Sequence, residues 1–224
     1  MNLSARATRF KLLATDLDGT LLDRSGAIHE RDRRAIAELQ RRGVAVTIVT
    51  GRMYSGTRDL ARSLLLDGPI GCLDGSAIVA VREDRHLVSR ALAGEAGRVL
   101  QAALAGGSPA VFILGHDQIF HDARGAPFAQ YVRGWTSRIT HVDDVTAAPH
   151  WETEAGVAGV IAVGTKEEIE ALVSGLAPAA ALVAPVAFPV SRDGFAGHWA
   201  MVARPPAPPR AARCSGSPRI MGST

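Results

Sequence analysis

Two short apolar runs near the N-terminus each end abruptly in a polar, turn-forming segment. Residues 10–15 (FKLLAT) lead into residues 16–19 (DLDG), and residues 44–49 (VAVTIV) lead into residues 50–52 (TGR). Apolar runs of this length that stop at turn-forming residues are typical of buried strands. The sequence therefore predicts two buried strands, each with polar side chains directly after its carboxyl end.

Helical patterns separate these strands from each other and from a third. Residues 29–43 and residues around 54–66 carry apolar side chains at helical spacing, and residues 69–73 form a third apolar run that ends at 74–76 (DGS). Strands that alternate with helices predict an α/β fold with a doubly wound parallel sheet. Ligands bind such sheets at the carboxyl ends of the strands, where the polar segments fall.

The pattern changes from residue 77 onward, where hairpins are mixed with helices. This mixture predicts a separate α+β unit rather than more of the parallel sheet. We divide the chain into a core portion at 1–76, an α+β unit at 77–195, a strand that begins the return to the core at 196–203, and a Pro- and Arg-rich tail at 204–224. Within the second unit, Thr165 and Glu168 predict a capping box at the start of a helix.

The first two polar segments together suggest phosphoryl transfer. Asp16 and Asp18 are separated by one residue just beyond a strand, so one carboxylate can attack phosphorus while the other handles protons. A divalent cation such as Mg²⁺ would offset the repulsion between these acids and an anionic substrate. The hydroxyl of Thr50 and nearby backbone N–H groups can hold phosphoryl oxygens. The plainer interpretation, a polar turn at Asp16 and Asp18, would leave the second strand-terminal segment as a coincidence.

These segments resemble the motifs of a known family. FKLLATDLDGTLLD resembles the first motif of the haloacid dehalogenase (HAD) superfamily of phosphohydrolases, and VTIVTGR resembles the second; together they cover residues 10–52. GPIGCLDGSAIVA, with an insert that begins after the third strand, resembles the Cof-type subgroup. In that subgroup an α+β cap lies between the second and third motifs of a Rossmann-like core.

The resemblance implies a Mg²⁺-dependent phosphatase of small phosphomonoesters, such as sugar phosphates, that works through an aspartyl phosphate. Asp16 would be the nucleophile and a metal ligand, and Asp18 the general acid/base whose backbone carbonyl also binds the metal. The cap would choose the substrate. Asp74 would face the site, although a plain turn explains it equally well. The implied phosphate-binding residues are Gly19, Thr20, Thr50 and Gly51, and those on the substrate side are Arg52 and Asp74.

The C-terminal motifs of the family have no counterpart in the chain. It contains no Gly-Asp dipeptide, and its only asparagine is Asn2, so the Gly-Asp-x-x-Asn-Asp segment that completes the family's metal site is missing. Lys166 lies inside the predicted cap and does not replace the family's lysine. We expect the core to be incomplete at its C-terminal side. Another reading frame from about Arg204 is compatible with the missing Lys-Gly, which predicts a frameshift there.

Three alternatives to an active phosphatase therefore stay open. The chain can be a non-catalytic, truncated remnant, or a binding module that keeps the cap. A phosphomutase on the same scaffold differs only in whether water or a sugar hydroxyl accepts the phosphoryl group.

Net charge and cysteine content limit the classes of partner and the cellular compartment that we expect for the chain. The net charge is +3, but the tail at 204–224 holds four arginines and no acid, so the rest of the chain is slightly acidic and nucleic-acid binding is not expected. Two cysteines, Cys72 and Cys214, cannot form the disulfide framework of a secreted domain, and no signal peptide precedes them, which favours the cytoplasm.

Three prolines interrupt the uncharged run at 171–191, which we interpret as a helix end followed by a buried strand rather than a membrane span. The expected partner is a small phosphorylated metabolite, and the oligomeric state stays open.

Two further sets of side chains are weaker candidates. The histidine–aspartate pairs at 116–117 and 121–122 invite a metal role, but both belong to one predicted hairpin without further ligands. Trp135, Trp151 and Trp199 can line a sugar site, although isolated aromatic residues more often pack in a core.

Overall fold

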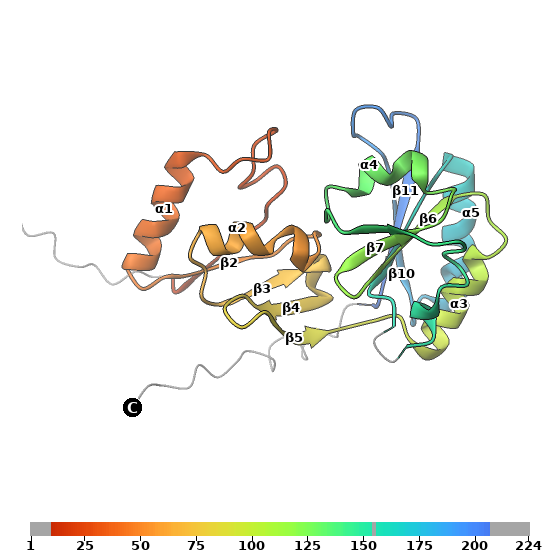
Figure 1. The fold of residues 1–224 in the computed structure, drawn as a ribbon, viewed down its shortest axis with the longest axis horizontal. Helices are drawn as coiled ribbons and strands as arrows, with labels where there is room; N and C mark the ends of the chain where they lie inside the picture. Colours follow the sequence, from red (N-terminus) through yellow and green to blue (C-terminus); the bar gives the residue numbers. More distant parts are fainter. Residues whose placement is uncertain (1–9, 154–155, 207–224) are drawn as a thin grey trace, which may run out of the picture.

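The first three strands form the parallel sheet that the sequence predicts. The computed structural model describes residues 10–153 and 156–206. Strand β1 (Leu12–Thr15) pairs in parallel with β2 (Ala45–Ile48), and a parallel bridge between Val49 and Gly71 joins β2 to β3 (Pro69–Cys72). Because the strands run in one direction, the segments after β1, β2 and β3 meet at one edge of the sheet (Figure 1).

Helices α1 (Glu30–Arg41) and α2 (Arg58–Ser63) connect these strands, and a hairpin extends the sheet. The hairpin consists of β4 (Ala77–Ala80), antiparallel to β3, and β5 (Arg85–Ser89), antiparallel to β4. The predicted boundary at residue 77 placed this hairpin in the α+β unit, whereas its hydrogen bonds join it to the first sheet. A sequence pattern predicts the hairpin but not the strand against which it pairs.

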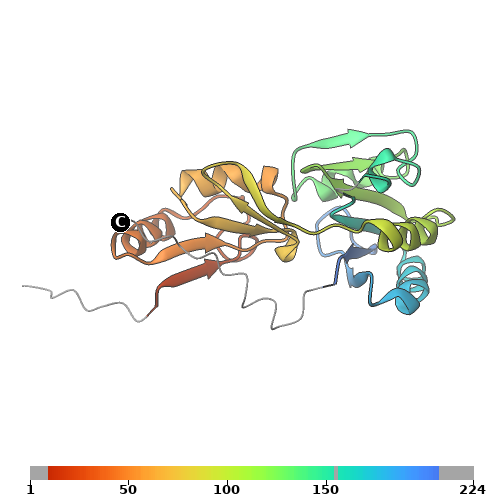
Figure 2. The same cartoon turned by 90° about the horizontal axis from the view of Figure 1, so that it is seen from below.

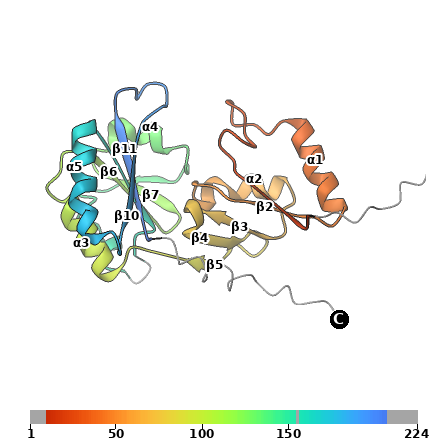
Figure 3. The same ribbon diagram turned by 180° about the vertical axis from the view of Figure 1, so that it is seen from behind.

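The second unit is a six-stranded sheet in the order β10-β11-β9-β6-β7-β8. Helices α3 (Gly94–Leu104) and α5 (Lys166–Leu176) cover the face that lies away from the first unit, and α4 (Ala129–Val132) lies on the other face (Figures 1 and 3). The capping box of Thr165 and Glu168 at the start of α5 is confirmed. The strands are β6 (Ala110–Gly115), β7 (Gln118–His121), β8 (Ile139–His141), β9 (Gly159–Gly164), β10 (Ala184–Pro189) and β11 (Trp199–Arg204).

Strand β11 differs from the prediction that residues 196–203 begin a return to the core. It pairs in antiparallel fashion with both β9 and β10, so it is an inner strand of the six-stranded sheet. Its neighbour β10 is the edge strand and is only half-buried, not the buried strand predicted within 171–191. An edge position explains why β10 tolerates Pro185 and Pro189, which cannot donate to a neighbouring strand. The remainder of the tail, 207–224, with the proposed change of frame, lies outside the described residues.

Strand β1 is exposed, which corrects the prediction of a buried first strand. The side chain of Leu12 is 59% exposed, and Leu13 and Val49 are also exposed. Among the described residues, β1 has a strand partner on one side only, so it forms an edge of the sheet (Figure 2). An apolar strand is buried only when other elements cover it, and within residues 10–153 and 156–206 nothing covers this surface to the extent the sequence predicts.

Two short segments hold the units together. The first is the turn that begins at Met53 and continues through the 3₁₀-helix η1 (Tyr54–Gly56), and the second is residues 131–136 after β7. The N–H of Met53 donates to the carbonyl oxygen of Trp135 at 3.1 Å, and the hydroxyls of Ser55 and Thr136 lie 2.7 Å apart. Ser55 also contacts the turn between β6 and β7, where Oδ1 of Asp117 accepts a hydrogen bond from the Ser55 N–H at 2.8 Å. These bonds set the position of one unit against the other.

No helix among the described residues is both long and apolar enough to cross a membrane.

Burial of Leu17, which follows β1, predicts a stability difference within one segment. Leu17 is 0% exposed and Leu12 is 59% exposed. We expect Leu17→Ala to lower the free energy of unfolding by about 2–5 kcal/mol, because it removes buried methyl groups and leaves a cavity. The matched variant Leu12→Ala should cost less than about 1 kcal/mol. Urea denaturation of both variants checks this difference, and equal losses would contradict the burial described here.

The close contact between the turn at residues 53–56 and residues 131–136 predicts that two glycine variants differ in hydrogen exchange. A Cβ on Gly56 would overlap the carbonyl oxygen of Trp135 and lie 2.9 Å from its carbonyl carbon. Gly56→Ala should therefore push the two segments apart and speed hydrogen exchange at the amide of Met53. Gly68→Ala is the matched control, because a Cβ there meets nothing within 4 Å. Unchanged exchange at Met53 in Gly56→Ala would refute the close approach.

Candidate functional site

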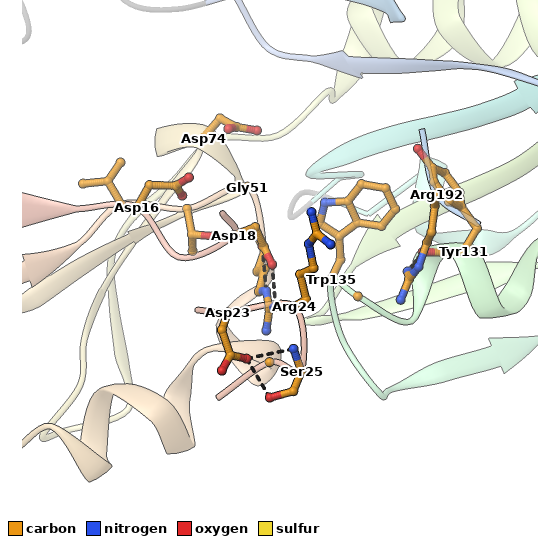
Figure 4. A pocket seen from close by; sticks show the side chains of 15 residues that line it. Asp16, Asp18, Asp23, Arg24, Ser25, Gly51, Asp74, Tyr131, Trp135 and Arg192 are labelled. Carbon is orange, nitrogen blue, oxygen red and sulfur yellow. Dashed lines mark hydrogen bonds and ion pairs between the residues drawn. The ribbon is translucent and has the colours of Figure 1, made fainter. Parts of the chain in front are cut away.

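A cleft of about 840 Å³ lies where the carboxyl edge of the first sheet faces the second unit (Figure 4). One wall comes from the segments after β1, β2 and β3, and the other from the region of α4 and the β10–β11 loop. Six of the predicted site residues line it. The lining residues are Asp16, Asp18, Asp23, Arg24, Ser25, Gly26, Val49, Thr50, Gly51, Arg52, Asp74, Tyr131, Gly134, Trp135 and Arg192.

The segment after β1 presents two carboxylates to this cleft because the residue between them is an anchor. Leu17 is fully buried, and its carbonyl oxygen accepts hydrogen bonds from the N–H groups of Leu21 and Leu22 at 3.0 and 2.9 Å. Asp16 and Asp18, on either side of this buried leucine, are both exposed and both line the cleft. The sequence alternation of acid, leucine and acid thus produces a pair of accessible carboxylates.

Asp18 is held by an arginine from the neighbouring strand end. The Nε of Arg52 donates to Oδ2 of Asp18 at 2.9 Å, and its Nη2 donates to Oδ1 at 2.6 Å. This two-bond geometry fixes the orientation of a carboxylate more strongly than a single contact does. The side chain of Asp18 is still 62% exposed, so it stays accessible to a ligand in the cleft.

Thr50 is buried and its backbone groups are already used. Its N–H donates to the carbonyl oxygen of Gly71 at 2.9 Å, and its own carbonyl oxygen accepts from the N–H of Asp74 at 3.0 Å. The hydroxyl oxygen accepts from the N–H of Arg52 at 3.2 Å. The hydroxyl proton of Thr50 therefore remains to be donated, whereas its backbone N–H is not free for a phosphoryl oxygen.

Asp74 joins the site through a strained turn and an ion pair. Its backbone lies in the left-handed region (φ 51°, ψ 36°), and its Oδ2 lies 2.5 Å from Nη1 of Arg204. A Cβ built on Gly51 would lie 3.4 Å from both carboxylate oxygens of Asp74, an ordinary contact distance, so the Asp74 carboxylate lies beside the second strand end. Sequence reasoning missed Arg204, which it assigned to the tail, because only the pairing of β11 brings that residue here.

Two predicted phosphate-binding residues lie outside the cleft lining. Gly19 has φ 74° and permits the turn after Asp18, and the N–H of Thr20 donates to the carbonyl oxygen of Leu17 at 3.2 Å. Their observed contacts are those of a turn.

The opposite wall was largely missed by sequence reasoning. Trp135 lines the cleft, in agreement with the weaker interpretation of it as a ligand-facing aromatic residue, and its ring lies edge-on to Tyr131 at 5.3 Å between centroids. Arg192 on this wall, and Arg24 on the wall formed after β1, were not singled out. Arg24 reaches toward Trp135, and Arg192 lies beside Tyr131 (Figure 4). No local pattern marks these two arginines among the many in the chain.

The other candidates have structural roles in the described part of the chain. Trp151 is buried, with its indole N–H donated to the carbonyl oxygen of Val145 at 2.9 Å. Trp199 is half-buried beneath Lys166. Asp122 forms an ion pair with Arg124, whose N–H bonds to the Asp122 side chain lower the pKa of that carboxyl although its burial opposes the shift.

Cysteine chemistry does not contribute to the candidate site among the described residues. Cys72, at the end of β3, is fully buried. Burial, followed by the negative charge of Asp117, raises the pKa of its thiol to about 12. A thiol with such a pKa is protonated at neutral pH and is a poor nucleophile or metal ligand.

The carboxylate of Asp16 and the backbone carbonyl of Asp18 are the candidate metal ligands. Mg²⁺ prefers oxygen ligands and usually takes one or two carboxylates, with water and substrate phosphate completing its shell. Among the residues that the structure describes, no group of three or more histidine, cysteine, aspartate or glutamate side chains is placed to hold a metal. One accessible carboxylate and one backbone carbonyl thus fit an ion that draws its other ligands from elsewhere.

Curated relatives match about a third of the chain. The 5-amino-6-(5-phospho-D-ribitylamino)uracil phosphatase YcsE of Bacillus subtilis is 40% identical over 78 residues, which is 35% of this chain and 31% of that protein. The phosphoglycolate phosphatase of Methanopyrus kandleri is 38% identical over 73 residues, 33% of this chain and 31% of that protein. The matched region thus spans about a third of the length of these relatives.

Solved structures share the fold over most of the chain. A haloacid dehalogenase-like hydrolase from Bacteroides thetaiotaomicron superposes with a TM-score of 0.74 at 20% identity, covering 92% of this chain and 75% of the other. The sugar phosphatase BT4131 of HAD subclass IIB gives a TM-score of 0.59 at 17% identity, covering 87% of this chain and 70% of the other. These likenesses support the α/β fold with a second unit.

A family model supplies the assignment. The model for haloacid dehalogenase-like hydrolases matches residues 13–178, which is most of the chain and includes both strand-terminal segments and most of the second unit. With the fold and the paired carboxylates in place, the chain belongs to the haloacid dehalogenase-like hydrolase family.

Proposed function

We propose that this protein is a phosphatase that hydrolyses a small phosphomonoester through an aspartyl phosphate on Asp16. The observation that carries the proposal is the pair of accessible carboxylates, Asp16 and Asp18, which the buried Leu17 presents to one cleft. A carboxylate nucleophile divides one difficult displacement at phosphorus into two easier ones.

Asp16 is suited to attack. Its carboxylate makes no hydrogen bond or ion pair with the described residues, so its lone pairs are available. An oxygen of Asp16 forms a bond to phosphorus while the bond from phosphorus to the ester oxygen breaks, and the leaving alcohol takes up a proton. Water then attacks the aspartyl phosphate, which releases inorganic phosphate and restores the carboxylate.

Asp18 is proposed as the general acid and base for these two steps. It would give a proton to the leaving ester oxygen and later take one from the attacking water. The two hydrogen bonds from Arg52 hold its orientation, and its exposure keeps it within reach of the cleft. The free hydroxyl proton of Thr50 would be donated to a phosphoryl oxygen, where negative charge grows in the transition state.

Mg²⁺ is the proposed cofactor, held by the carboxylate of Asp16 and by Asp18. When bound, it neutralises charge on the carboxylates and on the phosphoryl oxygens.

A small phosphorylated metabolite is the proposed substrate. The cleft volume of about 840 Å³ falls within the range of small-molecule sites. The relatives named for activity act on phosphorylated small molecules, by the words of their names: phosphoglycolate, a sugar phosphate and a phosphoribitylamino-uracil. The side of the cleft formed by Tyr131, Trp135 and Arg192 would contact the part of the substrate beyond the phosphate.

A second candidate function is a binding module that keeps the cleft without turnover. The exposed apolar face of β1 favours it, since a sheet edge left uncovered can leave the neighbouring Asp16 loosely held. The two candidates differ in whether a phosphomonoester is hydrolysed or only bound.

Substitution of the nucleophile separates them. We expect Asp16→Asn to lower Mg²⁺-dependent hydrolysis of p-nitrophenyl phosphate by at least about a thousand-fold, because an amide cannot attack phosphorus. Asp67→Asn is the matched control, as Asp67 is exposed and precedes β3 at the far edge of the sheet. Hydrolysis by wild type that survives in Asp16→Asn would refute the assignment, and a folded wild type without hydrolysis would favour the binding module.

Removal of the metal gives an independent check. We expect EDTA to abolish phosphate release and added MgCl₂ to restore it, because the two acids repel an anionic substrate without a cation. Phosphate release is measured with malachite green, and circular dichroism checks that the fold persists in EDTA. Turnover that continues in EDTA would contradict the metal-dependent proposal.

A further inference from the structure

Two arginines of the cleft form no ion pair with any acid among the described residues. Arg52 and Arg204 are neutralised by Asp18 and Asp74. In contrast, Arg24 makes no hydrogen bond or ion pair with the described residues, and the side chain of Arg192 bonds only to a neutral group, the carbonyl oxygen of Tyr131, at 2.7 Å from Nη1. Both line the cleft and are exposed. Their positive charge is therefore available to a ligand.

The loop that bears Arg192 is fixed in place. The N–H of Val190 donates to the carbonyl oxygen of His198 at 2.9 Å, and the N–H of Phe195 donates to that of Arg192 at 3.1 Å. The ring of Phe195 packs on Tyr131 at 5.6 Å between centroids. The hydrogen bonds and ring contact tie the β10–β11 loop to α4, so the Arg192 side chain is anchored before any ligand arrives.

Space beside Arg192 depends on a residue without a side chain. A Cβ on Gly134 would lie 3.2 Å from Nη1 of Arg192, closer than most such contacts. Gly134 thus leaves room for the guanidinium to bond to Tyr131 and to present its other N–H groups to the cleft. Trp135 follows in the chain, and Arg24 reaches toward its indole from the opposite wall (Figure 4).

The acids that adjoin these arginines in the chain, Asp23 and Asp193, form no ion pair with either of them among the described residues. Asp23 accepts hydrogen bonds from the N–H groups of Ser25 and Ala27 at 2.8 and 3.1 Å and from the hydroxyl of Ser25 at 2.6 Å. Asp193, next to Arg192 in the chain, does not line the cleft. Arg192, on the wall opposite Asp16 and Asp18, and Arg24, which reaches toward that wall, therefore present positive charge that no carboxylate of the described residues pairs with.

We propose that Arg192, assisted by Arg24, is a specificity-determining residue that binds a second anionic group of the substrate, such as a carboxylate, at the far end from the phosphate. This inference rests on the proposed phosphatase function and narrows its substrate class to phosphomonoesters with a second negative charge. A planar guanidinium offers parallel N–H donors to a carboxylate, and one such donor is already fixed by Tyr131.

A matched pair of phosphonates tests the proposal without turnover, because their carbon–phosphorus bond cannot be hydrolysed at this site. The two ligands are 3-phosphonopropionate, which carries a terminal carboxylate, and propylphosphonate, which carries a methyl group instead. We expect isothermal titration calorimetry of wild type in MgCl₂ to give a Kd for the carboxylate ligand at least about tenfold lower. Arg192→Gln should remove this preference and leave the Kd for propylphosphonate unchanged, and Arg24→Gln should reduce it.

Arg133→Gln is the matched control, since Arg133 is exposed at the end of α4, two residues from the Tyr131 that Arg192 contacts, but does not line the cleft. It should keep the preference, and Arg192→Lys should keep part of it. Equal affinity of wild type for both ligands, or a preference that survives Arg192→Gln, would overturn the proposal.

The result separates this proposal from that of the phosphatase. Hydrolysis of p-nitrophenyl phosphate without a preference for the carboxylate ligand would leave the phosphatase standing and remove the second anion site. A preference lost in Arg192→Gln, in a protein that hydrolyses no phosphomonoester, would support the anion site and remove the phosphatase. Binding of neither ligand would overturn the anion site.

Discussion

Burial of Leu17 is the interaction on which the candidate site depends. It places one apolar side chain in the core of the first unit, and its carbonyl oxygen receives the N–H groups of Leu21 and Leu22. The turn that begins at this buried residue leaves Asp16 and Asp18, on either side of it, exposed and lining the cleft. Burial of one leucine thereby accompanies the exposure of two acidic side chains that line the same cleft.

The second constraint is the contact that sets the two walls of the cleft against each other. The N–H of Met53 binds the carbonyl oxygen of Trp135, and Ser55 binds Asp117. Met53 follows the Thr50–Arg52 segment, and Trp135 itself lines the cleft. A few hydrogen bonds therefore couple the acidic wall that would hold the phosphate to the basic and aromatic wall that would contact the rest of the substrate.

Sequence analysis predicted what depends on local pattern. The strands that end in polar segments, the α/β class and the capping box of α5 all follow from periodicity and turn chemistry, and the structure agrees. It was wrong about burial of β1 and about the place of β11, because both depend on which distant strand lies alongside. It also missed Arg192, which tertiary folding alone brings into the cleft. The roles of Asp16 and Asp18 stay predictions.

The most direct test of the central claim looks for the covalent intermediate itself. Wild-type protein is mixed with a phosphomonoester and MgCl₂, quenched with acid within its first turnovers, digested, and analysed by mass spectrometry. The mechanism predicts a phosphate on the peptide that contains Asp16, which is lost on treatment with hydroxylamine, as an acyl phosphate must be. Turnover with no phosphate on that peptide, or with phosphate on another residue, would contradict the account.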